Sequence, residues 1–486
     1  MKKSFLWIIL IWLIGAILYL YYIPEFENSR DFINYIILMV SYIYVPAIYI
    51  FSLNKYKIDI FEPCNIFFVL WYLIYTITPL LLILQNNTLC QGIDVMDGCV
   101  KATLIYMICF TIFCITYFGN TKNTKINRKE KYEKQIYTFD IERYSLGQRR
   151  NIAIIALIAW LVCYLISLFY LIKTGRGLSY ILTLGLAGQK VETAEFSIGF
   201  LENISYCMIG FWLYFCVVSK NKFLKIVLAF FTATAYLIRG FRFVVIIMFM
   251  AYAIVHYTRN NRRPKTRQII VCVLCALVFI GVLGAVRGDL RTGTKIDFSS
   301  LGIDDITYAL YTNFNIYQIY YGLVNALPFK HGFGGFQIAI ENLSVFIPRI
   351  LWPGKLPTKE LLCYRLIGIS VSDYAVYHAA MATPDLGAYY MQFGTIGCIL
   401  YTFIWGKICK NMKYLFYRKT FNIHVFISYA IFVPSLLQAI IRGGDLFDIV
   451  RKIGFFFIPI LVMKIFEKFG VISSNINRLN VMEEPV

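Results

Sequence analysis

The stretch that decides the fold class is an uninterrupted apolar run at residues 151–172, which reads NIAIIALIAWLVCYLISLFYLI. No residue in this run is charged. A helix of about 20 apolar residues is long enough to cross the hydrocarbon core of a lipid bilayer, which is about 30 Å thick. We therefore expect this run to form a transmembrane helix.

The same kind of run recurs along the whole chain. Of its 486 residues, 59% are hydrophobic and 15% are charged, whereas soluble domains average about 45–50% and about 25%. One water-soluble core cannot bury so much apolar surface, so lipid must solvate part of it. We predict an all-α polytopic membrane protein with about twelve spans, in which residues 1–486 form a single integral membrane domain. The predicted spans are 5–22, 33–52, 66–84, 102–118, 151–172, 198–219, 226–238, 244–257, 269–286, 386–406, 423–441 and 453–465.

The excess positive charge falls on one side of the predicted membrane. The chain has 47 lysines and arginines and 27 acidic residues, a net charge of +20. With a cytoplasmic N-terminus and alternating spans, the cytoplasmic side holds 29 of the basic and 9 of the acidic residues. The outer side holds 18 of each. This asymmetry follows the positive-inside rule, predicts cytoplasmic N- and C-termini, and explains the net charge without nucleic-acid binding.

Two long hydrophilic stretches separate groups of spans. Residues 120–150 are rich in lysine and arginine, and we expect a cytoplasmic loop that fixes the topology. Residues 287–385 form a predicted outer loop that is rich in Tyr, Phe and Ile. Apolar residues recur at helical spacing in 304–327 and 336–346, so we expect short amphipathic or re-entrant helices there. A loop of this length and aromatic content is a natural place for function.

Two cysteines, Cys90 and Cys99, lie in the same predicted outer loop. In an oxidising compartment they could form a local disulfide, and a pair of free thiols is the equal alternative. Most of the other cysteines lie within predicted spans, where we interpret them as small packing residues.

Arginines mark the short hairpin between the seventh and eighth predicted spans, Arg239-Gly-Phe-Arg242. About thirteen apolar residues precede Arg239, and at 1.5 Å per residue they span roughly 20 Å, less than a ~30 Å hydrocarbon core. The hairpin would then hold two guanidinium groups near headgroup depth. Guanidinium binds phosphate oxygens in bidentate fashion, so we expect a diphosphate as the ligand. The alternative is that both arginines only extend toward the polar surface from a helix end.

More cations are predicted on the outer side. They are Arg287 and Arg291 after the ninth span, Arg349 and Lys355 within IPRILWPGK at 347–355, and Arg442 before the last span. Taken singly, each is more commonly a surface charge than a ligand. Together they predict a cationic vestibule that could stabilise a departing pyrophosphate.

Two outward residues are candidates for a general base that accepts a proton from a sugar hydroxyl. His378 lies in YHAAMATPD at 377–385, just before the tenth span, and Asp385 ends that segment. Imidazole and carboxylate can both take this role. A hydrogen-bonded loop histidine is an equal alternative for His378. His256 and His424 fall at predicted cytoplasmic helix ends, where we expect structural roles.

No cofactor or metal ion is expected. The outer loops contain no Asp-x-Asp motif, and Glu25-Phe-Glu27 and Asp304-Asp305 are weak substitutes for one. The chain also lacks a phosphate-binding loop and a dinucleotide fingerprint, which argues against an ATP-driven transporter. The predicted chemistry therefore rests on arginines, lysines and a single base.

Three features in this order resemble a known family. They are the Gly-x-Arg hairpin at 240–242, the outer-loop segment IPRILWPGKLP at 347–357, and the helix start DLGAYYMQFG at 385–394. The chain resembles the Wzy-type O-antigen (oligosaccharide repeat unit) polymerases, in motif over 239–400 and in topology over its whole length. One position departs from the pattern, because Gly387-Ala-Tyr389 with Asp385 upstream stands where Gly-Glu-x-Tyr is expected.

The resemblance implies a GT-C-like helical transferase in the bacterial inner membrane. It implies a glycosyltransferase that polymerises undecaprenyl-diphosphate-linked oligosaccharide repeat units into O-antigen or a similar surface polysaccharide at the periplasmic face. The growing chain would leave its lipid diphosphate and join the sugar hydroxyl of a new repeat unit. Besides membrane lipid, a flippase and a chain-length regulator would be candidate partners.

The resemblance also implies roles for the candidate residues. Trp352 and Tyr389 would stack on sugar rings, His378 is the first candidate base, and Asp385 is the second. The cations would bind phosphate or glycan: Arg239 and Arg242 the donor diphosphate, Arg287, Arg291 and Arg442 the second or departing diphosphate, and Arg349 and Lys355 the glycan beneath the outer loop.

Two other functions fit the same composition. A lipid-linked oligosaccharide flippase would also have many spans and basic cytoplasmic loops, but we would expect charges in mid-membrane and short outer loops. Here charges within spans are rare, and Glu202 is the nearest case. An O-antigen ligase, which moves glycan to a lipid A core, would share the fold and the outer-loop site, so composition does not separate it from a polymerase.

Overall fold

The computed structural model describes residues 29–56, 58–84, 89–90, 92–119, 144–172, 199–238, 242–260, 262–285, 302, 314–336, 363, 366–368, 382–418, 422–441, 443 and 446–469. Within these residues almost all regular structure is helical, which confirms the predicted all-α class. The exception is an antiparallel pair of two-residue strands, β1 (Leu89–Cys90) and β2 (Ile93–Asp94). The helices are α2 (Ser29–Tyr56), α3 (Pro63–Tyr72), the π-helical turn η1 (Leu73–Ile77), α4 (Thr78–Leu84), η2 (Met96–Gly98), α5 (Cys99–Phe118), α7 (Leu146–Ile172), η4 (Gly199–Tyr206), α9 (Cys207–Val218), α10 (Lys222–Ile238), α11 (Arg242–Arg259), α12 (Thr266–Ala285), α15 (Tyr317–Ala326), α19 (Asp385–Arg418), α20 (Ile423–Ile441) and α21 (Leu446–Lys468).

Several of these helices can cross a membrane, which confirms the polytopic membrane class. Five are long and apolar enough: Ser29–Leu53, Pro63–Leu84, Met96–Phe118, Leu146–Phe169 and Ile423–Ile441. They coincide with the second, third, fourth, fifth and eleventh predicted spans. The first predicted span, and most of 120–150 and 287–385, lie outside the described residues. A total of twelve spans and a GT-C-like arrangement therefore stay predictions.

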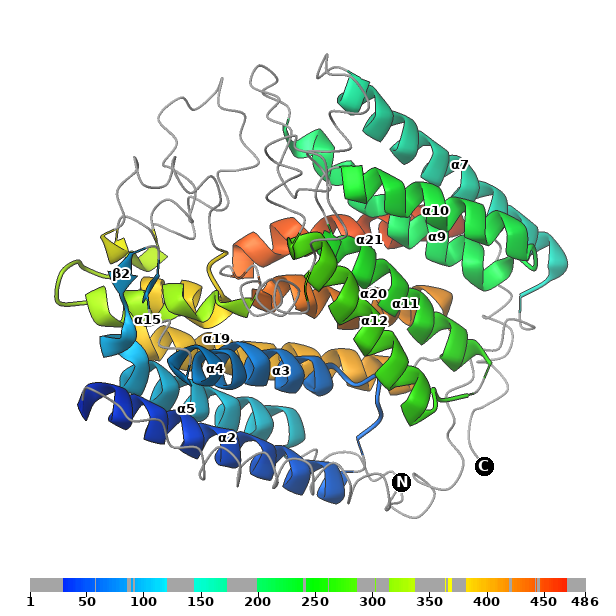
Figure 1. The fold of residues 1–486 in the computed structure, drawn as a ribbon. Coiled ribbons are helices and arrows are strands. Elements are labelled where there is room, and N and C mark those ends of the chain that lie inside the picture. The colour runs from blue at the N-terminus through cyan, green and yellow to red at the C-terminus, as the bar shows by residue number, and fades with distance from the viewer. Residues whose placement is uncertain are drawn as a thin grey trace.

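The helices run side by side, so their connections gather at two ends of the bundle (Figure 1). At one end, Arg30 at the start of α2 pairs with Asp94 at 2.8 Å and Asp97 at 3.1 Å, both just before α5. We name this the Asp385 end, because α19 begins there. At the other end lies Glu62, between α2 and α3, and we name it the Glu62 end. The described connections alternate between the two ends in the predicted order.

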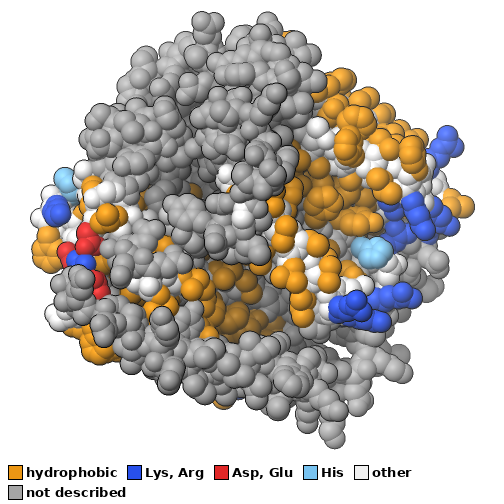
Figure 2. Space-filling view, in the orientation of Figure 1, with side chains coloured by type: hydrophobic (Ala, Val, Ile, Leu, Met, Phe, Trp, Pro, Cys, Tyr) orange, Lys and Arg blue, Asp and Glu red, His pale blue; other side chains and the backbone are white. Residues whose placement is uncertain are grey.

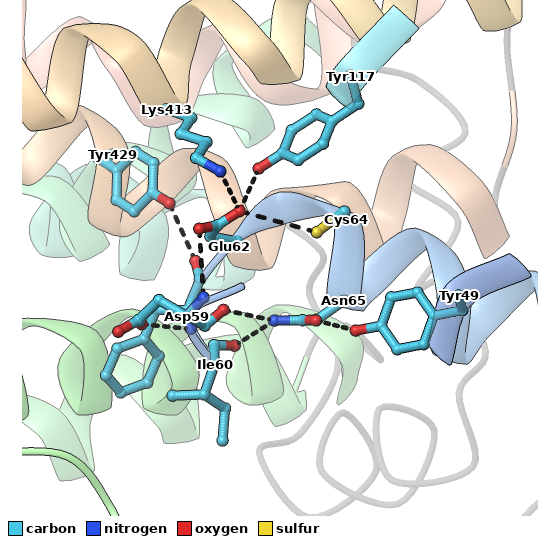
Figure 3. Close-up of polar contacts among 10 residues, drawn as sticks. Tyr49, Asp59, Ile60, Glu62, Cys64, Asn65, Tyr117, Lys413 and Tyr429 are labelled. Atoms are coloured by element: carbon cyan, nitrogen blue, oxygen red, sulfur yellow. Dashed lines mark hydrogen bonds and ion pairs between the residues drawn. The ribbon is translucent and has the colours of Figure 1, made fainter. Parts of the chain in front are cut away.

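A buried carboxylate ties the Glu62 end together (Figure 3). Glu62 is 3% exposed and accepts a hydrogen bond from the Tyr117 hydroxyl at 2.9 Å, at the end of α5. It also pairs with the Lys413 ammonium at 2.5 Å, near the end of α19. Arg263, between α11 and α12, pairs with Asp59 at 2.6 Å. These contacts join two connections and the ends of two helices that are far apart in sequence.

Charge is distributed unevenly between the two ends (Figure 2). Basic side chains dominate the Glu62 end, on the right of the view. The connections and helix ends there include Lys222, Arg259, Arg262, Lys265 and Arg267. Described charges at the Asp385 end include both signs: Arg30, Lys101 and Lys330, and Asp31, Asp94, Asp97 and Asp385. This arrangement has the asymmetry that the sequence predicts for the two sides of a membrane.

The turn η1 interrupts the helical stretch between α3 and α4. The Leu73 carbonyl accepts a hydrogen bond from the Thr78 hydroxyl at 2.8 Å beside this wider turn. π-Helical turns within α-helices are frequent at functional sites. Here the turn begins just after Trp71 and contains Tyr75, and both side chains are buried against the start of α19.

A kink divides α19 into a short first segment, 385–392, and a long helix that begins at 395. Phe393 and Gly394 are non-helical, and Gly394 has φ +63° and ψ −147°, a conformation that glycine tolerates best. A Cβ at Gly394 would lie 2.7 Å from Cζ of Phe333. The Met391 carbonyl, beside the kink, accepts a hydrogen bond from the Gly334 N–H at 2.9 Å. The segment 327–336, which follows α15, is therefore fixed against the kink.

Candidate functional site

The Asp385 carboxylate is held at the centre of the Asp385 end. It is 1% exposed. One oxygen accepts a hydrogen bond from the Trp71 indole N–H at 2.8 Å, and the other accepts one from the Tyr75 hydroxyl at 2.6 Å. The Leu386 N–H also donates to the carboxylate, at 2.9 Å. No lysine or arginine among the described residues pairs with it, so neutral donors stabilise its charge.

Burial of this carboxylate sets its chemical character. An isolated buried charge is costly, and the cost falls when each oxygen receives a hydrogen bond. Both oxygens of Asp385 are engaged, which favours a rigid side chain over one that swings toward a substrate. As a candidate base, Asp385 is thus pre-oriented by α3 and η1, more than 300 residues earlier in the chain.

Tyr389, one turn further along α19, is also enclosed by protein. It is 1% exposed, its hydroxyl accepts a hydrogen bond from the Trp405 N–H at 2.7 Å, and its ring stacks on Tyr401 at 4.5 Å between centroids. The described arrangement explains its burial by packing. Contact with a sugar ring stays a prediction.

The neighbouring Tyr390 connects this buried cluster to the surface. Its hydroxyl donates to the Leu327 carbonyl at 3.2 Å, and its ring lies 5.8 Å from that of Phe333. The ammonium group of Lys101, an exposed residue at the start of α5, lies 5.4 Å from the centre of the Tyr390 ring. Sequence reasoning missed Lys101, because one lysine at a span end is an ordinary feature of a membrane protein.

The backbone after Arg442 lies against the start of α19. Gly443 is buried with φ +31°, and a Cβ there would lie 2.3 Å from the Thr383 carbonyl oxygen and 2.7 Å from the Asp385 nitrogen. Only glycine allows this approach. Two segments that the sequence predicts as functional, RGGD at 442–445 and the start of α19, are thus in contact at Gly443.

A residue from the stretch 287–385 reaches the same place. The Thr383 hydroxyl donates to Sγ of Cys363 at 3.2 Å, and Cys363 also contacts Sδ of Met391 at 3.5 Å. The site at the Asp385 end is therefore built from α3, η1, α19, the Gly443 segment and position 363 of this stretch.

Most of the predicted site residues lie outside the described part of the chain. Arg242 is the first residue of α11, but its side chain is outside that part. Arg239, Arg287, Arg291, Arg349, Trp352, Lys355, His378 and Arg442 are outside it altogether. Their proposed roles stay predictions.

Two secondary expectations have an outcome in the structure. His424 is buried at the Glu62 end, where its ring nitrogens share hydrogen bonds with the Tyr214 hydroxyl at 2.6 Å and with Glu467 at 2.8 Å. These two hydrogen bonds agree with the structural role that we expected for His424. Cys90 and Cys99 are both buried and are not joined in a disulfide, so the local disulfide is not formed in the structure.

Comparison with known proteins gives one match. The model of the family described as O-antigen polysaccharide polymerase Wzy matches residues 4–469. No curated protein matches the chain, and no solved structure matches it.

Proposed function

The chain belongs to the O-antigen polysaccharide polymerase family Wzy, and on that premise we propose that it joins undecaprenyl-diphosphate-linked oligosaccharide repeat units into a surface polysaccharide. The reaction would take place at the periplasmic face of the bacterial inner membrane, with both termini in the cytoplasm. The family match over residues 4–469 is the observation that carries this proposal.

The charge distribution supports the proposed side of the membrane. Basic residues mark the cytoplasmic ends of spans. The Glu62 end is the basic one, so the Asp385 end would face the periplasm. Lipid-linked repeat units would then meet the site that Asp385, Tyr75 and Gly443 build.

The proposed reaction is a glycosyl transfer between two lipid-linked glycans. A hydroxyl oxygen of the new repeat unit forms a bond with the anomeric carbon of the growing chain. The bond between that carbon and the lipid diphosphate breaks, and the diphosphate leaves with the electron pair. The hydroxyl proton passes to a base, for which His378 is the first candidate and Asp385 the second.

The cations would act on the diphosphates. Arg239 and Arg242 would bind the donor, and Arg287, Arg291 and Arg442 would hold the second diphosphate or neutralise the departing one. Contact between Gly443 and the Thr383–Asp385 backbone supports a place for Arg442 close to the candidate base. Arg349, Trp352 and Lys355 would contact the outer-loop glycan, and Tyr389 would do so only if its packing against Tyr401 opened.

The direct test uses purified protein and a lipid-linked repeat unit in detergent. A ladder of products without added nucleotide, metal ion or core lipid would support a polymerase. A flippase would give no product under these conditions. An O-antigen ligase would give product only after lipid A core is added, and either result would contradict the proposal.

A further inference from the structure

We propose that Lys101 and Lys330 form a binding site for the diphosphate of a membrane-anchored prenyl lipid, whose chain lies along the exposed apolar stripe of α5. This inference rests on the proposed function, because it names where the lipid-linked substrate first meets the protein.

Lys101 supplies the first cation of this site. Its ammonium group lies 5.4 Å from the centre of the Tyr390 ring and 5.9 Å from that of Phe329. These cation–π contacts hold the side chain at the Asp385 end of α5. No carboxylate within the described ranges pairs with Lys101, so its charge is available to an anion.

An apolar stripe runs down α5 from Lys101. Leu104, Ile108 and Ile115 follow at helical spacing and are 44%, 47% and 65% exposed. In a membrane helix this stripe faces lipid. A cation at headgroup level above an apolar stripe is complementary to an amphiphile with an anionic head and a long hydrocarbon chain.

The segment 327–336 supplies the second cation and the aromatic surface around it. Lys330 is exposed, and within the described residues it has no carboxylate partner. Phe329 and Phe336 are 87% and 74% exposed, which is unfavourable in water and favourable at a bilayer interface. Figure 2 shows apolar and basic side chains at this end of the molecule, together with acidic ones, of which Asp31, Asp94 and Asp97 pair with Arg30.

This surface is rigidly placed beside the candidate active site. Phe333 fills the kink at Gly394, and the Gly334 N–H binds the Met391 carbonyl, so the segment cannot shift without disturbing α19. Tyr390 contacts Lys101 on one side and Tyr320 on the other, at 6.4 Å between ring centres. It lies within the same short helical segment as Asp385. A lipid bound here would have its diphosphate next to the segment that carries Asp385.

A diphosphate fits this pair of cations better than an ordinary phospholipid. Two lysines without described carboxylate partners can neutralise two phosphate groups, whereas one phosphodiester would leave one lysine uncompensated. The stripe from Leu104 to Ile115 covers about three helical turns, or roughly 16 Å, along which part of a methyl-branched prenyl chain can lie. We therefore commit to a prenyl diphosphate as the occupant.

The experiment measures binding of undecaprenyl diphosphate to purified protein in nanodiscs of neutral lipid. The double variant Lys101→Gln/Lys330→Gln should bind about tenfold more weakly or worse, because two charge-assisted contacts are lost. The matched control is Lys407→Gln, which removes another exposed lysine that lies over a phenylalanine ring, 4.5 Å from Phe403, on the far part of α19. It should bind as the parent does.

Competitors identify the ligand chemistry. Excess undecaprenyl diphosphate should displace the labelled lipid, while inorganic pyrophosphate and phosphatidylglycerol should do so only weakly. Unchanged binding by the double variant would overturn the proposal, as would equal competition by phosphatidylglycerol, which would mark a general anionic-lipid surface.

The failure of this site can be distinguished from the failure of the proposed function. If wild-type protein makes glycan ladders and the double variant binds the lipid as the parent does, the lysine site is refuted and the polymerase function stands. Loss of binding in the double variant without any wild-type ladder would support the site and refute the polymerase.

Discussion

At the scale of single residues, hydrogen-bond donors fix the orientation of the Asp385 carboxylate. Trp71 and Tyr75 come from a span that carries no charge, and neither looks functional in the sequence. Their contact with a carboxylate some 310 residues later is a tertiary pairing that no local pattern encodes. The sequence did single out Asp385, as an outward carboxylate at the start of the tenth predicted span. It could not show that this acid is buried.

Removing one donor should destabilise the site. Tyr75→Phe deletes the 2.6 Å hydrogen bond to a buried carboxylate, and such bonds are worth about 1.5–3 kcal/mol. We expect a loss of this size in the free energy of unfolding, measured by SDS titration in mixed micelles. Tyr44→Phe removes an exposed hydroxyl contact with Thr111 at 2.8 Å and is the matched control. If both variants unfold at the same point as the parent, the Asp385 cluster does not stabilise the protein.

The guanidinium geometry of Arg239 should matter as well as its charge. Arg239→Lys keeps a positive charge but cannot form two parallel hydrogen bonds to phosphate, so polymerisation should be severely reduced. The readout is the glycan ladder made by cells that carry the variant. Arg267→Lys, an exposed position at the Glu62 end, should leave the ladder unchanged. A parental ladder from Arg239→Lys would remove this residue from diphosphate binding.

At the scale of elements, the order of helices and their alternation between two ends could be predicted from hydrophobic length and charge. The π-helical turn after Trp71 and the kink at Gly394 could not. Both depend on distant partners, because the kink accommodates a phenylalanine ring from the segment after α15. The motif DLGAYYMQFG was correctly expected at the start of a helix, and the structure shows that its last two residues interrupt that helix.

Filling the kink should disturb α19. Gly394→Ala adds a Cβ at φ +63°, where it would meet the Phe333 ring at 2.7 Å, and backbone strain of this kind costs about 1–3 kcal/mol. We expect a lower midpoint of thermal unfolding in detergent. Gly454→Ala is the control, because nothing lies within 4 Å of the added Cβ in helix α21. It should be neutral or stabilise by about 0.5–1 kcal/mol. An unaltered midpoint for Gly394→Ala would contradict the fixed kink.

At the scale of the whole molecule, the Glu62 network holds together connections that the sequence leaves separate. Glu62→Gln would remove one charge from the buried ion pair between Glu62 and Lys413, at a cost of about 3 kcal/mol. The SDS titration midpoint should fall accordingly. Asp97→Asn, which changes a 57% exposed side chain, should change stability by less than about 0.5 kcal/mol. Equal effects of the two substitutions would argue against a stabilising role for the buried pair.

The orientation of the molecule decides whether the Asp385 end can meet lipid-linked glycans at all. The direct measurement is labelling of single introduced cysteines in intact spheroplasts with a membrane-impermeant maleimide, in a background without native cysteines. Gly332→Cys, at the Asp385 end, should be labelled in intact spheroplasts, and Lys265→Cys, at the Glu62 end, should be labelled only after the membrane is permeabilised. Labelling of Lys265→Cys alone in intact spheroplasts would place the Asp385 end in the cytoplasm and contradict the account.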